Sequence, residues 1–127
     1  MALTILVVDD NVTMCGVLNA VLRRAGYQVL IARDAQVALE FLRDRQPDLL
    51  ITDLELPVVS GLELVRLVRQ SPEPLGSLPT IVLTAWDRPE SQAAAEALGC
   101  VAFLTKPVAN AVLLQTLSDV LGTAAQR

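Results

Sequence analysis

Residues 3–10, LTILVVDD, give the first indication of the architecture, because six residues rich in apolar strand formers end in two aspartates. A strand with one face in water would alternate apolar and polar residues. Near-continuous apolar character is instead typical of a parallel strand that is buried on both faces. Four further segments share this character, and we predict five strands: Leu3–Val8, Gln28–Ala32, Leu49–Thr52, Thr80–Thr84 and Val101–Thr105.

The segments between these strands carry apolar residues at helical spacing. Asp34 is a suitable N-cap for the second helix, and Gly26 and Gly99 are suitable stops for the first and fourth. In the fourth helix we expect an apolar face formed by Ala93, Ala94, Ala97 and Leu98. Strand and helix therefore alternate five times, which predicts a doubly wound α/β domain with a five-stranded parallel sheet.

The length of 127 residues suits one domain. We expect residues 1–122 to form it and residues 123–127 to be a C-terminal tail or the start of a linker. The formal net charge is −4 and no basic cluster is present, which argues against direct binding to nucleic acid and favours protein partners. The first residues lack a signal-peptide pattern, and no apolar run approaches the roughly 18 residues of a membrane span, so we expect a cytoplasmic protein without membrane contact.

The cysteine and histidine content excludes several chemistries. Cys15 and Cys100 form no CxxC pair, and the chain has no histidine to complete a zinc site. We expect both thiols to be reduced and buried. Without histidine there is no Ser-His-Asp triad and no phosphohistidine. Any phosphoryl group that arrives from a histidine must therefore come from another molecule.

Polar side chains follow four of the predicted strands at the point where each strand ends. Asp9 and Asp10 follow the first strand and Asp53 the third, while Thr84 ends the fourth and Lys106 follows the fifth. Ligands of doubly wound sheets bind at the carboxyl ends of the strands. We therefore expect three carboxylates, one hydroxyl and one ammonium to converge at one edge of the sheet.

Three neighbouring carboxylates repel one another unless a cation lies among them. Mg2+ is the expected cation, since it prefers oxygen ligands and keeps several waters. Asp9 or Asp10, the carboxylate of Asp53 and a backbone carbonyl just after Asp53 could supply the protein ligands. An aspartate beside such a cation is a competent nucleophile towards phosphorus and would form an acyl phosphate.

Lys106 is the only lysine in the chain, beside nine arginines. Its compact ammonium on a flexible stem can contact a phosphoryl oxygen, and the hydroxyl of Thr84 can contact another. A cis Lys106–Pro107 bond would turn the lysine into the site. A trans Pro107 that opens the last helix is equally compatible with the sequence.

With these residues in place, the sequence resembles the response-regulator receiver domain of two-component signalling, of the chemotaxis-regulator type. Four motifs in the family's order and spacing carry the resemblance, which covers essentially the whole chain: ILVVDDN at 5–11, PDLLITDLELPVVSG at 47–61, IVLTA at 81–85 and FLTKP at 103–107. The resemblance implies a (βα)5 fold of the flavodoxin-like type. The loop LPVVSG departs from the family's commoner pattern, which leaves loop mobility and partner choice open.

The resemblance also implies roles for individual residues. Asp53 would be the phosphoacceptor, and Asp9 and Asp10 would bind Mg2+ together with Asp53 and the backbone carbonyl of Glu55. Lys106 would contact the phosphoryl group.

Further positions are implied to act as a switch or to flank the site. Thr84 and Phe103 would be the switch pair, although Phe103 also suits ordinary core packing. Ala85 would leave the site open, while Trp86 and Glu55 would flank it. A cis bond before Pro107 is implied as well.

The partners implied are a sensor histidine kinase or histidine phosphotransfer protein and a downstream target or linked output domain. A second copy of the chain could bind through the face made by the fourth helix, fifth strand and fifth helix. Catalysis would be limited to self-phosphorylation and slow autodephosphorylation, so we do not expect an enzyme in the usual sense.

The sequence is also compatible with two other functions. One is a docking or dimerisation module that works without phosphorylation. The other is a phosphatase with an aspartate nucleophile and Glu55 as its general acid. Dinucleotide or flavin binding is disfavoured, because DDNVTMCG at 9–16 stands where a glycine-rich loop would be.

Overall fold

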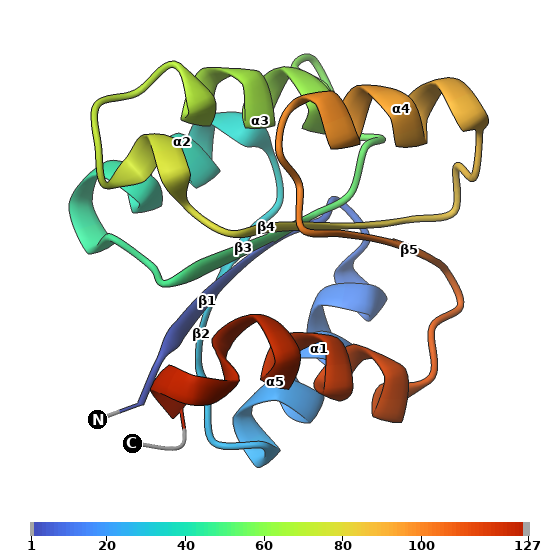
Figure 1. The fold of residues 1–127 in the computed structure, drawn as a ribbon. Coiled ribbons are helices and arrows are strands. Elements are labelled where there is room, and N and C mark those ends of the chain that lie inside the picture. The colour runs from blue at the N-terminus through green and yellow to red at the C-terminus, as the bar shows by residue number, and fades with distance from the viewer. Residues whose placement is uncertain (1, 126–127) are drawn as a thin grey trace.

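The computed structural model describes residues 2–125 (Figure 1). Five parallel strands form one sheet in the order β2-β1-β3-β4-β5. The strands are β1 Thr4–Val8, β2 Gln28–Ala32, β3 Leu49–Thr52, β4 Thr80–Thr84 and β5 Ala102–Thr105. The helices are α1 Val12–Arg24, α2 Ala35–Arg45, α3 Gly61–Arg69, α4 Pro89–Ala97 and α5 Asn110–Ala125, with a short 3-10 turn, η1, at Leu75–Ser77.

The predicted fold class is confirmed. Three predicted strands agree with the structure residue for residue, and the first and fifth begin one residue later than predicted. The sheet order places β1 in the middle of the first three strands, paired with β2 on one side and β3 on the other. The chain then crosses over to β4 and β5, which is the doubly wound topology.

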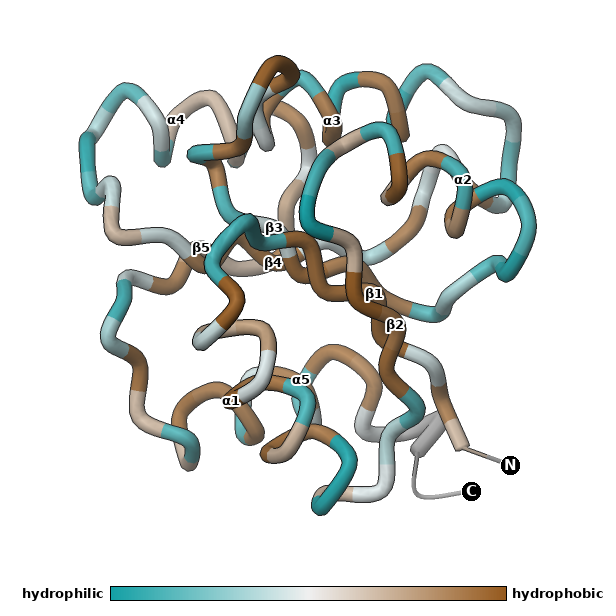
Figure 2. Tube along the Cα trace, turned by 180° about the vertical axis from the view of Figure 1, so that it is seen from behind, coloured by the Kyte–Doolittle hydropathy of each residue, from teal (hydrophilic) through white to brown (hydrophobic). Residues whose placement is uncertain are grey.

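Helices cover both faces of the sheet. Figure 1 shows α1 and α5 on one face and α2, α3 and α4 on the other. Within β1, Ile5 and Val7 pack with the α1 and α5 side, while Leu6 and Val8 pack with the α2 and α3 side. All four are at most 1% exposed. This double burial explains the uninterrupted apolar run, and Figure 2 shows the trace around β1 and β2 largely in brown, the hydrophobic end of the scale.

Side-chain caps begin three of the helices. Asn11, Asp34 and Ser60 accept hydrogen bonds from the first-turn amides of α1, α2 and α3. The predicted cap at Asp34 is thereby confirmed, with its Oδ1 2.9 Å from the amide nitrogen of Val37. α4 differs, because it starts after Arg88 without a side-chain cap from any described residue.

The predicted apolar face of α4 is partly wrong. Ala95 is the buried residue of this helix, while Ala93 and Ala97 are exposed. Three consecutive alanines, Ala93 to Ala95, offer no contrast between faces, so spacing alone could not select the correct one.

The end of the chain is helical further than the expected domain boundary. α5 continues through residue 125, so only residues 126–127 of the expected tail lie outside the described residues. None of the helices in residues 2–125 is long and apolar enough to cross a membrane.

The loop between β3 and α3 contains an unusual backbone conformation. Val58 has a φ of 68° and its side chain is fully exposed. A β-branched residue in this left-handed region is strained, because Cβ approaches the following carbonyl oxygen. The side chain gains no burial in return. The native sequence therefore carries local strain beside the end of β3.

Replacing Val58 by asparagine should relieve this strain, since asparagine enters the left-handed region more readily. We expect Val58→Asn to raise the free energy of unfolding by about 1 kcal/mol, measured by urea denaturation. Val101→Asn is the control, because Val101 is also an exposed valine but has no positive φ. A loss of stability in Val58→Asn, or an equal gain in both variants, would contradict this assignment of strain.

Candidate functional site

The carboxyl ends of four parallel strands place the predicted polar residues at one edge of the sheet. Asp9 directly follows β1, Asp53 follows β3, and Lys106 follows β5, while Thr84 is the last residue of β4. Backbone hydrogen bonds continue the ladder into these positions: Asp53 N–H donates to Val8 O at 2.9 Å, and Lys106 N–H donates to Thr84 O at 2.8 Å. The sheet itself therefore fixes where these side chains start.

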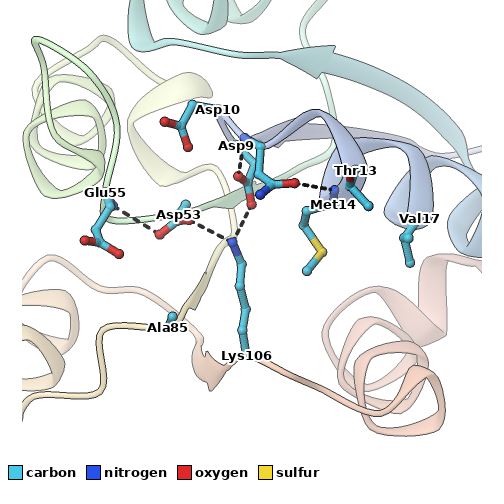
Figure 3. Close-up of a pocket in the computed structure, with 10 residues that line it drawn as sticks. Asp9, Asp10, Thr13, Met14, Val17, Asp53, Glu55, Ala85 and Lys106 are labelled. Atoms are coloured by element: carbon cyan, nitrogen blue, oxygen red, sulfur yellow. Dashed lines mark hydrogen bonds and ion pairs between the residues drawn. The ribbon is translucent and has the colours of Figure 1, made fainter.

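The ammonium of Lys106 lies between two buried carboxylates. Its Nζ is 2.6 Å from Asp9 Oδ2 and 2.8 Å from Asp53 Oδ2 (Figure 3). Asp9 is 2% exposed and Asp53 6%. Burial by itself lowers the pKa of Lys106, but the hydrogen bonds and negative charges of Asp53 and Asp9 outweigh it. The pKa of Lys106 is therefore raised above 10.5, and the lysine is held as a cation.

The second oxygen of each carboxylate accepts a backbone amide. Asp9 Oδ1 lies 2.9 Å from the nitrogen of Asn11, and Asp53 Oδ1 lies 3.1 Å from the nitrogen of Glu55. Both side chains are thus held at two points. Among the residues described, no buried side-chain nitrogen or oxygen lacks a partner.

The acidic residues form a candidate metal centre. Carboxylate oxygens of Asp9, Asp10 and Asp53 all lie within 4.8 Å of one another, and Asp10 is exposed. Three carboxylates against one ammonium leave the cluster with a formal surplus of two negative charges. An all-oxygen donor set with this charge fits a hard divalent cation such as Mg2+.

The cluster opens into a cleft of about 590 Å³. Besides the acids and Lys106, Glu55 and Ala85 line it. The α1 side of the cleft, which was not predicted from the sequence, is formed by Asn11, Thr13, Met14 and Val17. Their position in the sequence directly after the acidic pair could have indicated this, because the start of a helix that follows a strand lies at the same edge of the sheet as the end of that strand.

Thr84 and Phe103 are not among the residues that line the cleft. Thr84 is fully buried, and its Oγ1 accepts the amide of Trp86 at 3.2 Å. The hydroxyl hydrogen remains free to donate to another group. Phe103 is half-buried and packs against the small cluster of Leu54, Val82 and Ala95.

Trp86 also lies outside the cleft wall. Its ring is 43% exposed, and the guanidinium of Arg88 stacks 4.1 Å from the ring centroid. The Lys106–Pro107 bond is cis, and so is the Glu73–Pro74 bond, for which no cis isomer was predicted.

Both cysteines are free thiols. Cys15 is buried, and its Sγ donates to the backbone oxygen of Asp9 at 3.2 Å. Burial, with the nearby charge of Asp9, raises the pKa of Cys15 and keeps it neutral. Cys100 is half-buried.

Gly61 allows α3 to approach the backbone of Asp53. A Cβ at position 61 would lie 1.9 Å from the carbonyl oxygen of Asp53 and 2.8 Å from Cα of Leu54. The amide of Gly61 donates to Leu54 O at 2.9 Å. The absence of a side chain here lets the start of α3 lie directly against the backbone of Asp53 and Leu54.

The sheet and its acidic, lysine-containing edge define an α/β domain of the flavodoxin-like type with its functional groups at the strand ends. The family sequence model described as the response regulator receiver domain matches residues 5–118 of this chain. The chain therefore belongs to the response regulator receiver domain family of two-component signalling.

Known proteins of similar sequence and structure agree with this assignment. The polar-differentiation response regulator DivK of Brucella anthropi is 29% identical over 121 residues, which are 95% of this chain and 98% of DivK. The chemotaxis protein CheY4 of Vibrio cholerae superposes with a TM-score of 0.89 at 32% identity, covering 95% of this chain and 100% of CheY4. The receiver domain of sensor histidine kinase PA1611 from Pseudomonas aeruginosa has a TM-score of 0.87 at 30% identity, covering 96% and 99%, and was solved with a magnesium ion coordinated in its active site cleft.

Substituting Gly61 tests how the backbone positions Asp53. Gly61→Ala should lower the free energy of unfolding by about 1–3 kcal/mol, because the new Cβ meets backbone that must shift. Gly16→Ala is the matched control, since Gly16 lies within α1 and a Cβ added there would have no described atom outside its own helix turn within 4 Å. The control should gain about 0.5–1 kcal/mol from higher helix propensity. Urea unfolding of both variants measures this, and equal effects of the two substitutions would rule out the close approach.

The raised pKa of Lys106 predicts a pH dependence of stability. A pKa that is higher in the folded state contributes stability fully below the unfolded value and loses it as pH rises through the folded value. The difference in free energy of unfolding between wild type and Lys106→Gln should therefore be fully present at neutral pH, where the carboxylate partners of the lysine are ionised, and should shrink as pH rises above 10.5. Urea unfolding of both proteins at matched pH measures this. A difference that grows above pH 10.5 would show that the lysine is not stabilised as a cation.

Proposed function

We propose that this domain accepts a phosphoryl group on Asp53 from the phosphohistidine of a partner protein, in a reaction that depends on Mg2+. The observation that carries the proposal is the contact of Lys106 Nζ with both Asp9 and Asp53, in a cluster of three carboxylates at one edge of the sheet. Membership in the receiver family supports the same conclusion.

Asp53 would act as the nucleophile. One carboxylate oxygen forms a bond to phosphorus while the bond between phosphorus and the histidine nitrogen breaks, and the imidazole leaves with the electron pair of that bond. The product is an acyl phosphate on Asp53. The bonds from Lys106 and from the amide of Glu55 hold the carboxylate in a fixed orientation before the reaction.

Asp9, Asp10, Asp53 and the backbone carbonyl of Glu55 would hold Mg2+. The bound cation supplies positive charge that stabilises the phosphoryl oxygens. The magnesium ion in the active site cleft of the PA1611 receiver domain supports a magnesium site in the corresponding cleft of this chain. The surplus negative charge of the cluster is the physical reason that a dication should bind here.

Lys106 and Thr84 would contact the phosphoryl group once it is attached. The Lys106 ammonium already touches Asp53 and can follow the new charge to a phosphoryl oxygen. The oxygen of Thr84 accepts from the amide of Trp86, and within residues 2–125 no group accepts the Thr84 hydroxyl hydrogen. Movement of Thr84 would then free space beside Phe103, whose ring would turn and change the face formed by α4, β5 and α5.

The proposed partners are a sensor histidine kinase or histidine phosphotransfer protein upstream and a protein target or linked output domain downstream, which includes a second copy of this chain on the α4–β5–α5 face. The net charge of −4 favours proteins over nucleic acid. We propose that the domain acts in the cytoplasm. Its catalysis is limited to its own phosphorylation and the slow hydrolysis of the acyl phosphate.

Incubation with acetyl phosphate and Mg2+ tests this function directly. Intact-mass measurement should show the addition of one phosphoryl group to wild type and none to Asp53→Asn, because the nucleophile is lost. Removal of Mg2+ with EDTA should abolish the adduct. Asp44→Asn is the control and should be phosphorylated like wild type, since Asp44 is an exposed carboxylate on α2 away from the cleft.

Two results would contradict the proposal. One is no adduct on wild type, and the other is an equal adduct on Asp53→Asn. Partner binding that is unchanged by Asp53→Asn would instead favour a docking module that works without phosphorylation.

A further inference from the structure

Arg69, in the last turn of α3, reaches across to the end of α4. Its Nε lies 2.6 Å from the backbone oxygen of Leu98, and its Nη2 lies 3.5 Å from that of Gly99. Leu98 is the C-cap of α4. The side chain of one helix therefore binds carbonyl groups at the carboxyl end of its neighbour, and Figure 1 shows both helices on the same face of the sheet.

The same guanidinium also holds the start of β4. Its Nη1 donates to Leu78 O at 2.9 Å and to Gly76 O at 3.3 Å, and its Nη2 donates to Thr80 Oγ1 at 3.3 Å. Arg69 thus joins α3, the segment before β4 and the junction between α4 and β5. This group of contacts lies at the amino-terminal edge of the sheet, opposite the acidic cleft.

The positive charge at the carboxyl end of α4 comes from Arg69 of α3 and not from α4 itself. α4 has no basic residue in its last turn, so its own sequence does not balance the negative end of the helix dipole. Arg69 provides a part-buried cation at that end and partners for two of its carbonyl groups. Hydrogen bonds from a charged donor are among the stronger ones in proteins.

The amino end of α4 is attached more weakly. Arg88 at the N-cap makes no side-chain cap bond within the described chain, and Ala95, near the other end, is the buried residue of the helix. The side chain of Gln92 bonds to exposed Asp87. This end is also the nearer one to the cleft, because Ala85 lines the cleft and the next residue, Trp86, donates its amide to Thr84 Oγ1.

We propose that Arg69 is the fixed anchor about which α4 moves when the domain is phosphorylated. Movement of Thr84 would release the Trp86 amide and displace the amino end of α4, while Arg69 holds the carboxyl end against α3 and β4. The displacement is then largest in residues 86–92 and small in residues 94–100. The moving part of this proposal rests on the proposed function, whereas the anchoring contact does not.

Amide hydrogen exchange, resolved by residue with NMR, tests the anchor in the unphosphorylated protein. Arg69→Gln should speed exchange in residues 94–100 by at least about tenfold, since the bonds to Leu98 and Gly99 are lost. Arg66→Gln is the matched control: it lies one turn earlier on α3 and pairs with exposed Glu63. It should leave residues 94–100 unchanged. Arg69→Lys keeps the charge but loses the planar guanidinium with its several N–H donors, so it should show a smaller increase in exchange rate. This variant replaces Arg69→Gln in the test if Arg69→Gln does not fold.

The second arm repeats the exchange measurement with acetyl phosphate and Mg2+. In wild type, phosphorylation should change the amide exchange rates of residues 86–92. The rates of residues 94–100 should stay within about twofold of their values in the unphosphorylated protein. In the Arg69 variants the change should extend into residues 94–100. A wild-type change of equal size in both segments, or unchanged exchange in the unphosphorylated Arg69 variants, would overturn the anchor. Absence of the phosphoryl adduct by mass would overturn the proposed function and the movement, while the unphosphorylated samples would still decide the anchoring contact.

Discussion

The pairing of one ammonium with two buried carboxylates is the interaction on which the site depends. Asp9 and Asp53 directly follow β1 and β3, which are neighbours in the sheet, so their carboxylates are brought close whether or not their charges favour it. Lys106, from the far edge strand, balances part of that charge. The remaining negative charge, shared with Asp10, makes the cluster suited to a divalent cation. The chemistry proposed for Asp53 follows from this imbalance.

The fold was predictable because its strands are buried on both faces. Leu6 and Val7 point to opposite helical layers, and both are apolar, so the run reads as continuous. The convergence of Asp9, Asp53 and Lys106 was predictable for a related reason, since parallel strands place all their carboxyl ends at one edge. These inferences needed only strand direction and order along the chain. They did not need knowledge of side-chain packing.

Features that depend on tertiary contacts were not predictable. The choice of Ala95 as the buried face of α4 is set by its neighbours, since the adjacent alanines are equally apolar. The approach of Gly61 to the Asp53 carbonyl joins two ends of a loop whose path the sequence does not specify. Nothing in the sequence around Arg69 marks it out, because its partners, among them Leu98, come from segments up to 30 residues away. Only the structure shows that α4 lies between a cleft at one edge of the sheet and an arginine-centred cluster at the other.

The most direct measurement of the central claim is a crystal structure of the domain grown with Mn2+, whose anomalous scattering locates the ion. Mn2+ takes the same oxygen ligands as Mg2+. We expect one strong anomalous peak in the cleft, from an ion bound by carboxylates of the Asp9, Asp10 and Asp53 cluster, with the Lys106 ammonium still in contact with Asp53. A cleft with no peak at saturating Mn2+, or an ion bound elsewhere on the domain, would contradict it.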